Sequence, residues 1–547
     1  MTAILVAMVA LPLVMLLMLA LRPLRPLIVR VLAIAPMPGL LVLPAAWQHG
    51  QWSTELLGTW NLVLDQPAAL MLFSASVLWC IGGFAASNWL AGRRGQGAFA
   101  MWWLMTLAGS LGVFVAADVA SFYLFYAAAS LPAYGLIVFG GGTADLKAGR
   151  VTLAAALLGE ALILAAFVML VAGVSGQGLL IRDLVSALAQ SPYRDPVILL
   201  VIVGFGLKIG LVPLHGWMPL SYGAGPLVAT AVLSGATSKA GLMGLIRFLP
   251  LDTPHPHWGG VLLAAGLLSA LYGAVIGLTQ SNPRSVLAYS SVSQLGQMAA
   301  VLGLGLASGN DAAVVMVAFY AVYHVLTKGG LFLALGVDLQ THAGAAAKLD
   351  LIVVIVLSLG FAGLPLTGGA LGKLAVKPIV GDGVAGIIFA IAAIGSTLLM
   401  LHFTRLLQRG VQHDIEKAGS RLARIAWFGV AIAAMILPWA LYAAVTAQPL
   451  SAAMSLKAVV DLAWPVVAGA VLWWAILRSG LIIPRLAAGD VWEWAFLWVL
   501  GRLQTCANAI AWFEQRSREW AVAAACMVLV MALLVLALTS ALADRIP

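Results

Sequence analysis

Apolar runs of about 20 residues follow one another along most of the chain, separated by short polar segments. A helix of about 20 apolar residues crosses the roughly 30 Å hydrocarbon core of a bilayer. The alternation of a membrane barrel is absent, and lipid offers no water to an open backbone. The pattern therefore predicts an all-α polytopic membrane protein with about 16 transmembrane helices. The expected spans cover residues 2–21, 27–46, 68–90, 99–118, 119–140, 151–173, 196–216, 226–249, 259–278, 283–306, 312–336, 351–381, 384–408, 424–446, 457–477 and 520–543.

Two connections are longer than minimal loops. Residues 47–67 are expected to form a short external hairpin or cap. Residues 478–519 mix Trp and Leu with Arg and Glu, which is typical of an amphipathic helix on a membrane surface. This segment is expected either to pack on this or a neighbouring subunit, or to be an ordinary linker that touches only lipid.

The composition supports the membrane prediction. Hydrophobic residues make up 63% of the chain and charged residues only 9%, against roughly 25% charged in soluble domains. The cysteines Cys80, Cys506 and Cys526 lie far apart and form no metal or cluster motif. No cofactor and no catalytic chemistry of its own are therefore expected of this chain, and any redox reaction belongs to a partner.

The net charge of +9 is explained by where the basic residues lie. With the N-terminus outside, 18 Lys and Arg residues fall in loops on the inner side and only 4 on the outer side. This asymmetry follows the positive-inside rule and predicts that both termini face outward. It leaves no reason to expect nucleic-acid binding.

Seven basic residues lie within or at the edges of spans. Three of them, Arg30, Lys377 and Lys457, are close enough to helix ends to reach the interface, so anchoring is expected. The other four, at the centres of their spans, are Lys208, Lys239, Lys328 and Lys373. A lysine at mid-bilayer costs about 2.5–3.5 kcal/mol on insertion scales, which favours a function for these four.

Two of these lysines lie beside predicted helix breaks. Pro213 follows Lys208, and Pro365 precedes Lys373 within a glycine-rich stretch. A broken helix at membrane depth is tolerated where it lines a polar cavity or is packed in protein. A lone proline kink is usually structural, but the coincidence of break and charge in both halves of the chain is typical of inverted-repeat transporters.

A relay is also indicated by polar residues on other spans. His324 and Lys328 are four residues apart on one helix face, with Tyr323 and Thr327 nearby. A lone buried histidine is more often satisfied structurally, but beside Lys328 a relay is favoured. Glu160 is the only carboxylate deep in a span. When a buried Glu–Lys pair weakens, the lysine releases a proton that hydrated neighbours can carry.

Several stretches resemble one family. The segments LKIGLVPLHGWMPLSYGAGP and LSGATSKAGLMGLIRF, then LTQSNPRSVLAYSSVSQLGQM and YHVLTKGGLFLALG, resemble the motifs of antiporter-like subunits. These are the proton-pumping membrane subunits of respiratory complex I, of group 4 hydrogenases and of Mrp-type sodium/proton antiporters. The resemblance runs from about residue 100 to 410.

The resemblance implies a fourteen-helix core with two inverted five-helix repeats, extended here by two spans. It implies that Lys208 is the lysine of the first broken helix, Lys239 the bridging lysine, His324 with Lys328 the central relay, and Lys373 the terminal gate. Accessory roles are expected for Asp118, His215, Tyr323 and Thr327. The expected division is into N-terminal helices (1–98), first repeat (99–249), second repeat (250–410), accessory helices (411–477), surface connector (478–519) and a last helix (520–547).

One departure from the family pattern affects the mechanism. The fifth helix usually carries a glutamate that pairs with the first lysine, but Ala127 stands there while Asp118 is kept. Glu160, on the next helix, is the candidate substitute. In addition, Gln294 replaces the family's histidine and Tyr222 a polar loop residue.

Three hypotheses follow. The leading one is a proton-translocating subunit of a larger energy-converting complex in a bacterial inner membrane, driven by a reaction on a catalytic peripheral partner. The second is a subunit of an Mrp-type cation/proton antiporter, for which sodium is the other ion. The third is a degenerate scaffold, or a subunit coupled to uptake of a small substrate such as inorganic carbon; retention of all four central lysines argues against simple degeneration.

Overall fold

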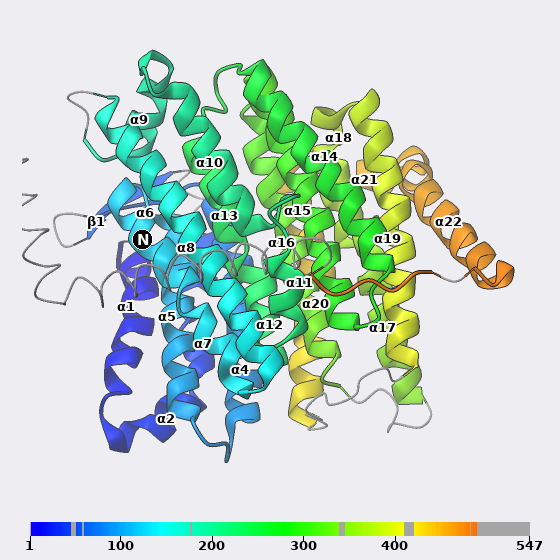
Figure 1. The fold of residues 1–547 in the computed structure, drawn as a ribbon, viewed down its shortest axis with the longest axis horizontal. Coiled ribbons are helices and arrows are strands. Elements are labelled where there is room, and N and C mark those ends of the chain that lie inside the picture. The colour runs from blue at the N-terminus through cyan, green and yellow to red at the C-terminus, as the bar shows by residue number, and fades with distance from the viewer. Residues whose placement is uncertain are drawn as a thin grey trace, which may run out of the picture. The chain divides into compact units, whose positions relative to one another are not determined.

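The described part of the chain is helical almost throughout, as the apolar pattern predicts (Figure 1). The computed structural model describes residues 2–44, 51–56, 60–174, 178–337, 345–409, 421–481 and 483–489. The chain divides into two units, Met1–Ala488 and Gly489–Pro547, and all of the second except Gly489 lies outside the described residues. The expected span 520–543 and most of the expected surface segment 478–519 are therefore outside them too.

The N-terminal region starts with one regular helix and continues through short turns. Its elements are α1 (Thr2–Met18), η1 (Arg22–Leu24), α2 (Arg25–Arg30), η2 (Leu32–Ile34), η3 (Met37–Leu41), β1 (Trp52–Leu56), β2 (Trp60–Leu64) and α4 (Gln66–Leu90). The single continuous helix expected over 27–46 is wrong, because this stretch folds as α2 followed by 3₁₀ turns. Pro36 and Pro38 lack backbone donors, which explains the interruption.

The segment expected to form a hairpin or cap contains a hairpin in its described part. Strands β1 and β2 pair antiparallel, with Trp52 opposite Leu64. The hairpin is tied to the helices by a bridge between Leu62 and Ala116 and by the backbone N–H of Asn61, which donates to the Asp118 carboxylate at 2.8 Å.

The next region contains one broken helix and one helix with a π turn. Its elements are α5 (Gln96–Val115), α6 (Val119–Ser130), α7 (Ala133–Ile137), η4 (Val138–Gly140), α8 (Thr143–Ala172), α9 (Ile181–Ala187), η5 (Leu188–Gln190), α10 (Arg194–Ile209), α11 (Trp217–Gly223), α12 (Leu227–Val232), the π turn η6 (Leu233–Thr237) and α13 (Lys239–Phe248). Between α10 and α11 the chain passes through Gly210, whose φ of 73° ends α10, and through Pro213.

The following region repeats the combination of long helices with one break. Its elements are α14 (Pro256–Leu278), α15 (Pro283–Ser308), α16 (Ala312–Ala334), α17 (Ala345–Ala362), α18 (Gly368–Val380) and α19 (Val384–Gln408). The expected span 351–381 is thus two helices, α17 and α18. The five residues between them include Gly363, with φ 100°, Pro365, and Leu366, with φ 65°.

Three further helices complete the described unit: α20 (Arg421–Thr446), α21 (Leu450–Ala453) and α22 (Leu456–Ser479). Ion pairs attach two of them to the preceding region. Arg424 of α20 donates to the buried Asp350 of α17, with Nη2 to Oδ1 at 2.8 Å, and Lys377 of α18 pairs with Asp461 of α22 at 2.6 Å. Lys377, expected to be only an interfacial anchor, therefore also joins α22 to the broken helix.

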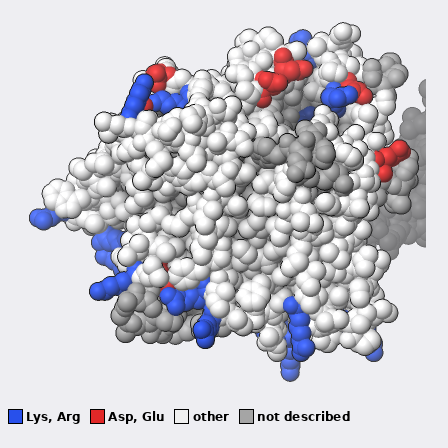
Figure 2. Space-filling view, turned by 180° about the vertical axis from the view of Figure 1, so that it is seen from behind, with Lys and Arg blue, Asp and Glu red and all other residues white. Residues whose placement is uncertain are grey.

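Among the described residues, nine helices are long and apolar enough to cross a membrane, or ten if the bent pair α1 and Arg22–Arg30 counts as one span. This establishes a polytopic helical membrane protein. The long helix α15 is not among the nine, and it carries several Ser and Gln residues. In the space-filling view the charged side chains lie mostly towards the upper and lower edges, and a broad uncharged band separates them (Figure 2).

Helices α14 and α15 pack with unusually close backbones. Gly259, Gly266 and Gly273 recur every seventh residue on α14. A Cβ on Gly266 would lie 2.5 Å from the backbone N of Ala300 and 2.6 Å from the carbonyl O of Gly296 on α15. Small residues permit such contact between membrane helices, where packing rather than water exclusion drives association.

We predict that Gly266→Ala lowers the midpoint of thermal unfolding of the detergent-purified chain, because the added methyl group must separate two backbones. The matched control is Gly260→Ala on the same helix, where a Cβ would meet no atom within 4 Å. Equal midpoints for the two variants would contradict the close-packing interpretation.

Candidate functional site

Lys239, at the centre of the candidate site, follows an irregular turn of the backbone. Lys239 directly follows the π turn η6 and Ser238. Its Nζ donates to the carbonyl O of Ser234, within that turn, and to Ser238 Oγ, both at 3.1 Å. A π turn alters the ordinary i to i−4 ladder and is frequent at functional sites. The local backbone thus supplies oxygen atoms to an amine whose side chain is fully buried.

Lys239 is brought against His324 of α16. The distance between Lys239 Nζ and His324 Nδ1 is 2.6 Å, and both side chains are fully buried. The two residues are 85 positions apart in the chain, so only the packing of η6 and α13 against α16 joins them. A contact this short between two basic groups requires that one of them presents a lone pair to the other.

Lys328 lies one turn further along α16. Its Nζ donates to the carbonyl O of Leu287 at 2.5 Å and to Ser290 Oγ, both on α15. It also lies 4.9 Å from the centroid of the Phe361 ring. The oxygen atoms come from the SVLAYSS stretch that follows the start of α15, so this polar motif solvates the second amine of the cluster.

Lys239, His324 and Lys328 form what we call the central cluster. Electrostatic interactions link its three members, and none of them contacts a carboxylate among the described residues. His324 Nε2 is buried and has no hydrogen-bond partner in the described part of the chain. Buried ring nitrogens of this kind are commonly satisfied by ordered water.

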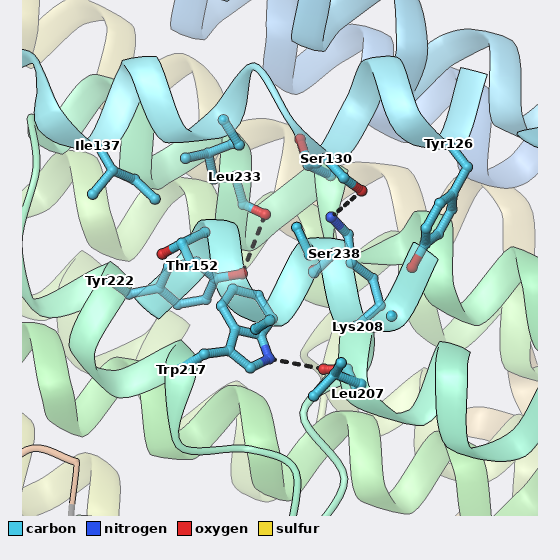
Figure 3. A pocket seen from close by; sticks show the side chains of 15 residues that line it. Tyr126, Ser130, Ile137, Thr152, Leu207, Lys208, Trp217, Tyr222, Leu233 and Ser238 are labelled. Carbon is cyan, nitrogen blue, oxygen red and sulfur yellow. Dashed lines mark hydrogen bonds between the residues drawn. The ribbon is translucent and has the colours of Figure 1, made fainter. Parts of the chain in front are cut away.

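Lys208, at the end of α10, faces a cavity beside the first broken helix. Its Nζ donates to Ser130 Oγ at 2.7 Å and lies 5.6 Å from the centroid of the Tyr126 ring (Figure 3). The indole N–H of Trp217 donates to the carbonyl O of Leu207 at 2.8 Å and thereby ties α11 to the end of α10. The broken helix therefore holds Lys208 in a fixed position.

The cavity beside Lys208 has a volume of about 30 Å³, enough for one or two water molecules. Its wall includes Thr237 and Ser238, which immediately precede Lys239. Because Ser238 Oγ also accepts from Lys239, one hydroxyl group lies between the cavity of Lys208 and the central cluster. Figure 3 shows Ser130 and Ser238 on the wall near Lys208.

Glu160, the candidate substitute for the missing glutamate, lies on α8 and is buried. It interacts electrostatically with Lys208, but the hydrogen bond that the structure gives to the Lys208 amine goes to Ser130. Glu160 Oε1 has no hydrogen-bond partner among the described residues. The carboxylate and the amine are thus neighbours without direct contact.

Lys373 lies at the second break. It belongs to α18, and its Nζ donates to the carbonyl O of Ala362, the last residue of α17, at 2.6 Å. The side chain lines a cavity of about 330 Å³ that also includes Lys377 and Asp461. Lys373 therefore borders a cavity that is larger than the one beside Lys208.

Gln294, a glutamine whose side-chain amide is hydrogen-bonded through both its nitrogen and its oxygen, lies between the central cluster and Lys373. Gln294 Nε2 donates to the carbonyl O of Phe361 at 3.2 Å, next to the carbonyl that holds Lys373. Its Oε1 accepts from the Tyr320 hydroxyl at 2.5 Å. Gln294, which replaces a histidine of the family pattern, thus has donor and acceptor both engaged.

The expected accessory residues have separate surroundings. Asp118 caps α6 by accepting from the backbone N–H of Ser121 at 2.8 Å, which is a structural contact. His215 is buried between Tyr272 and Tyr289. The Tyr323 hydroxyl donates to the carbonyl O of Leu357 at 3.0 Å, and Thr327 is buried one turn further along α16.

Sequence reasoning missed the groups that solvate the amines. Ser130 lies three residues after Ala127 on α6, so it occupies the same face one turn later. That spacing could have indicated it. The carbonyl groups of Ser234, Leu287 and Ala362 leave no residue-type signal, because every residue has one.

Comparisons with known proteins identify a family model and several relatives. The family model described as NADH:quinone oxidoreductase/Mrp antiporter, TM, matches residues 116–400, which contain all four buried or half-buried lysines. The chain is 31% identical to NADH-quinone oxidoreductase subunit N of Desulforudis audaxviator, over 66% of this chain and 75% of the relative. It is 30% identical to hydrogenase-4 component B of Escherichia coli over 53% of this chain, but spans only 46% of that relative.

Other matches include an antiporter and two solved complexes. A Na(+)/H(+) antiporter subunit of Alkalihalophilus pseudofirmus is 26% identical over 60% of this chain and 70% of the relative. The fold is similar to a chain of the Mrp complex from Dietzia sp., with a TM-score of 0.75, 20% identity, and coverage of 98% of this chain and 63% of that one. It is also similar to a chain of an archaeal membrane-bound sulfane sulfur reductase, with a TM-score of 0.68, 19% identity, and coverage of 97% and 99%. Because the family model covers more than half of the sequence, the chain belongs to the family of NADH:quinone oxidoreductase/Mrp antiporter transmembrane subunits.

Proposed function

We propose that this chain is a proton-translocating, antiporter-like subunit of a multi-subunit energy-converting membrane complex. The observation that carries the proposal is the central cluster, in which Lys239 Nζ and His324 Nδ1 are 2.6 Å apart and fully buried. Lys208 and Lys373 extend the cluster towards the two broken helices. The relatives that are subunits of quinone oxidoreductases and of a hydrogenase support a partner that supplies the driving reaction.

Electrostatic repulsion among the three basic groups of the central cluster favours transfer of protons over their storage. Three basic groups share a low-dielectric interior without a carboxylate partner among the described residues, so a proton on one disfavours a proton on the next. Hydroxyl and carbonyl oxygens solvate each amine, but they do not neutralise it. A proton that arrives at Lys239 therefore promotes the release of one from Lys328.

The proposed path starts at the first broken helix. Glu160 modulates the charge of Lys208 without contacting it, while Ser130 holds the amine. The small cavity and the Ser238 hydroxyl connect Lys208 to Lys239. In this proposal Glu160 takes the electrostatic part of the missing family glutamate, and Ser130 takes its hydrogen-bonding part.

The path is proposed to end at Lys373. Gln294 and the neighbouring carbonyl groups of Phe361 and Ala362 join the surroundings of the central cluster to this lysine. The adjoining cavity of about 330 Å³ is large enough to hold several water molecules. Proton exit through this cavity fits the expected role of Lys373 as the terminal gate.

The finer architecture is part of the same proposal. We infer two inverted five-helix repeats within residues 99–410, each containing one broken helix, and about 16 spans in the whole chain, with the one expected over 27–46 interrupted. The excess of Lys and Arg on one side supports a bacterial inner-membrane location with both termini on the outer side.

A second candidate is a subunit of an Mrp-type cation/proton antiporter, favoured by the similarity to the Alkalihalophilus pseudofirmus antiporter subunit and by the Mrp-like fold. The test measures proton translocation by the purified native assembly. If translocation requires sodium and proceeds without a redox or other exergonic substrate, this candidate is favoured over the first.

We predict that Lys239→Met abolishes proton translocation by the native assembly in liposomes, because the link between the Lys208 cavity and His324 is lost. Proton uptake is measured with a pH-sensitive dye while the driving reaction is followed separately. The matched control is Lys457→Met, which removes an exposed lysine at the start of α22. Unchanged pumping by the Lys239 variant in an intact assembly would refute the proposal.

We predict that Glu160→Gln reduces translocation by about tenfold, because Lys208 loses its charge interaction with this carboxylate; a tenfold change in rate corresponds to about 1.4 kcal/mol. The control is Glu55→Gln on the exposed face of β1. The same liposome assay measures both variants. Translocation by the Glu160 variant at the wild-type rate would show that Lys208 works without this carboxylate.

A further inference from the structure

A second polar cavity lies apart from the proposed proton path, where the C-terminal ends of α14, α19 and α22 meet. Its volume is about 310 Å³. Three arginines line it: Arg405 and Arg409 from the last turn of α19 and its end, and Arg485 from the segment that follows α22. None of the residues of the central cluster takes part.

Among the described residues, the three guanidinium groups have no acidic partner. No Asp or Glu lines the cavity, and none of the three arginines forms an ion pair among the described residues. By contrast, Arg247 and Arg424 near other helix ends each bind an aspartate. Unpaired arginines that converge on a concave site are typical of phosphate recognition.

The backbone of the segment that carries Arg485 is attached to the neighbouring helices, while the side chains of Arg409 and Arg485 are exposed. Arg485 lies on a segment held by the backbone N–H of Leu486, which donates to the carbonyl O of Thr279 at 3.4 Å. The Tyr289 hydroxyl donates to the carbonyl O of Ala488 at 3.0 Å and fixes the same segment further along. Arg485 is not on a helix, so compensation of a helix dipole does not explain it.

The cavity has an apolar side that continues onto exposed surface. Trp473 of α22 lies under Arg405, with 5.9 Å from the guanidinium carbon to the ring centroid. Leu477 and Leu481 also line the cavity, and their side chains are 43% and 64% exposed. A ligand that matches this wall carries a negative head and an apolar tail.

We propose that this cavity binds the phosphate headgroup of an anionic phospholipid, with the acyl chains along the exposed face of α22. Basic pockets between membrane helices on the positively charged side suit such headgroups. All three arginines belong to the set that lies on the side with excess Lys and Arg. The lipid would join α22 to α14 and α19.

The test uses the full chain, purified and delipidated in detergent, with thermal unfolding as the readout. We expect phosphatidylglycerol to raise the unfolding midpoint, because a ligand that binds only the folded state stabilises it. Phosphatidylcholine and inorganic phosphate should raise it much less. The combined variant Arg405→Gln, Arg409→Gln and Arg485→Gln should need at least about tenfold more phosphatidylglycerol for the same shift, a tenfold loss of affinity.

The matched control is the triple variant Arg93→Gln, Arg94→Gln and Arg150→Gln, which removes the same charge from exposed positions on the same side. Its unfolding midpoint should rise with phosphatidylglycerol as that of the wild type does. An equal loss in this control, or no preference of the wild type for phosphatidylglycerol, would overturn the proposal. So would an equal shift with inorganic phosphate, which would mean a free-anion site. If the triple variant fails to fold, Arg485→Gln alone is titrated, and an unchanged response overturns the proposal. The readout involves no transport, so its result does not depend on the proposed function.

Discussion

Lysine amines buried in a low-dielectric interior impose the requirement from which most other features of this molecule follow. Each amine must find oxygen atoms within the protein, because lipid offers none. The same solution recurs at Lys208, Lys239, Lys328 and Lys373: a serine hydroxyl, a backbone carbonyl, or both accept from Nζ. A contacting carboxylate would hold the proton firmly, whereas neutral oxygens solvate the charge and leave it free to move. The chemistry of the solvating groups thus matches a chain built for transfer.

Irregular backbone supplies part of this solvation. The Ser234 carbonyl that accepts from Lys239 belongs to a π turn, and the Ala362 carbonyl that accepts from Lys373 ends α17 at the second break. In both places the interrupted helix leaves a carbonyl available, and a regular helix would engage it in the i to i−4 ladder. Broken segments at membrane depth are tolerated because tightly packed helices surround them. The close backbones of α14 and α15, allowed by glycines such as Gly266, belong to that surrounding framework.

Helix α22, the last helix in the described part of the chain, contacts the core near both of its ends. Near its start, Asp461 pairs with Lys377 beside the cavity of Lys373. Near its end, Trp473 forms part of the basic cavity between α14 and α19. Helix α22 therefore borders both the cavity of Lys373 and the basic cavity. Its ion pair is partly exposed, so it is a weak and adjustable contact.

The membrane class, the positions of most long helices and the lysines that lie inside the helix bundle could all be predicted from the order of the amino acids, because runs of apolar residues and isolated charges within them are local signals. The motifs around Lys208 and Lys239 also identified the family. Which groups meet is settled by how separate helices pack. This holds for the contact between Lys239 and His324, for Ser130 as the hydrogen-bond partner of Lys208, and for the hydrogen bond that the Asn61 N–H donates to Asp118. Backbone carbonyls carry no side-chain signature, and spacing along one helix says nothing about the neighbouring helix. The solvation of the buried amines therefore could not be predicted without the folded chain.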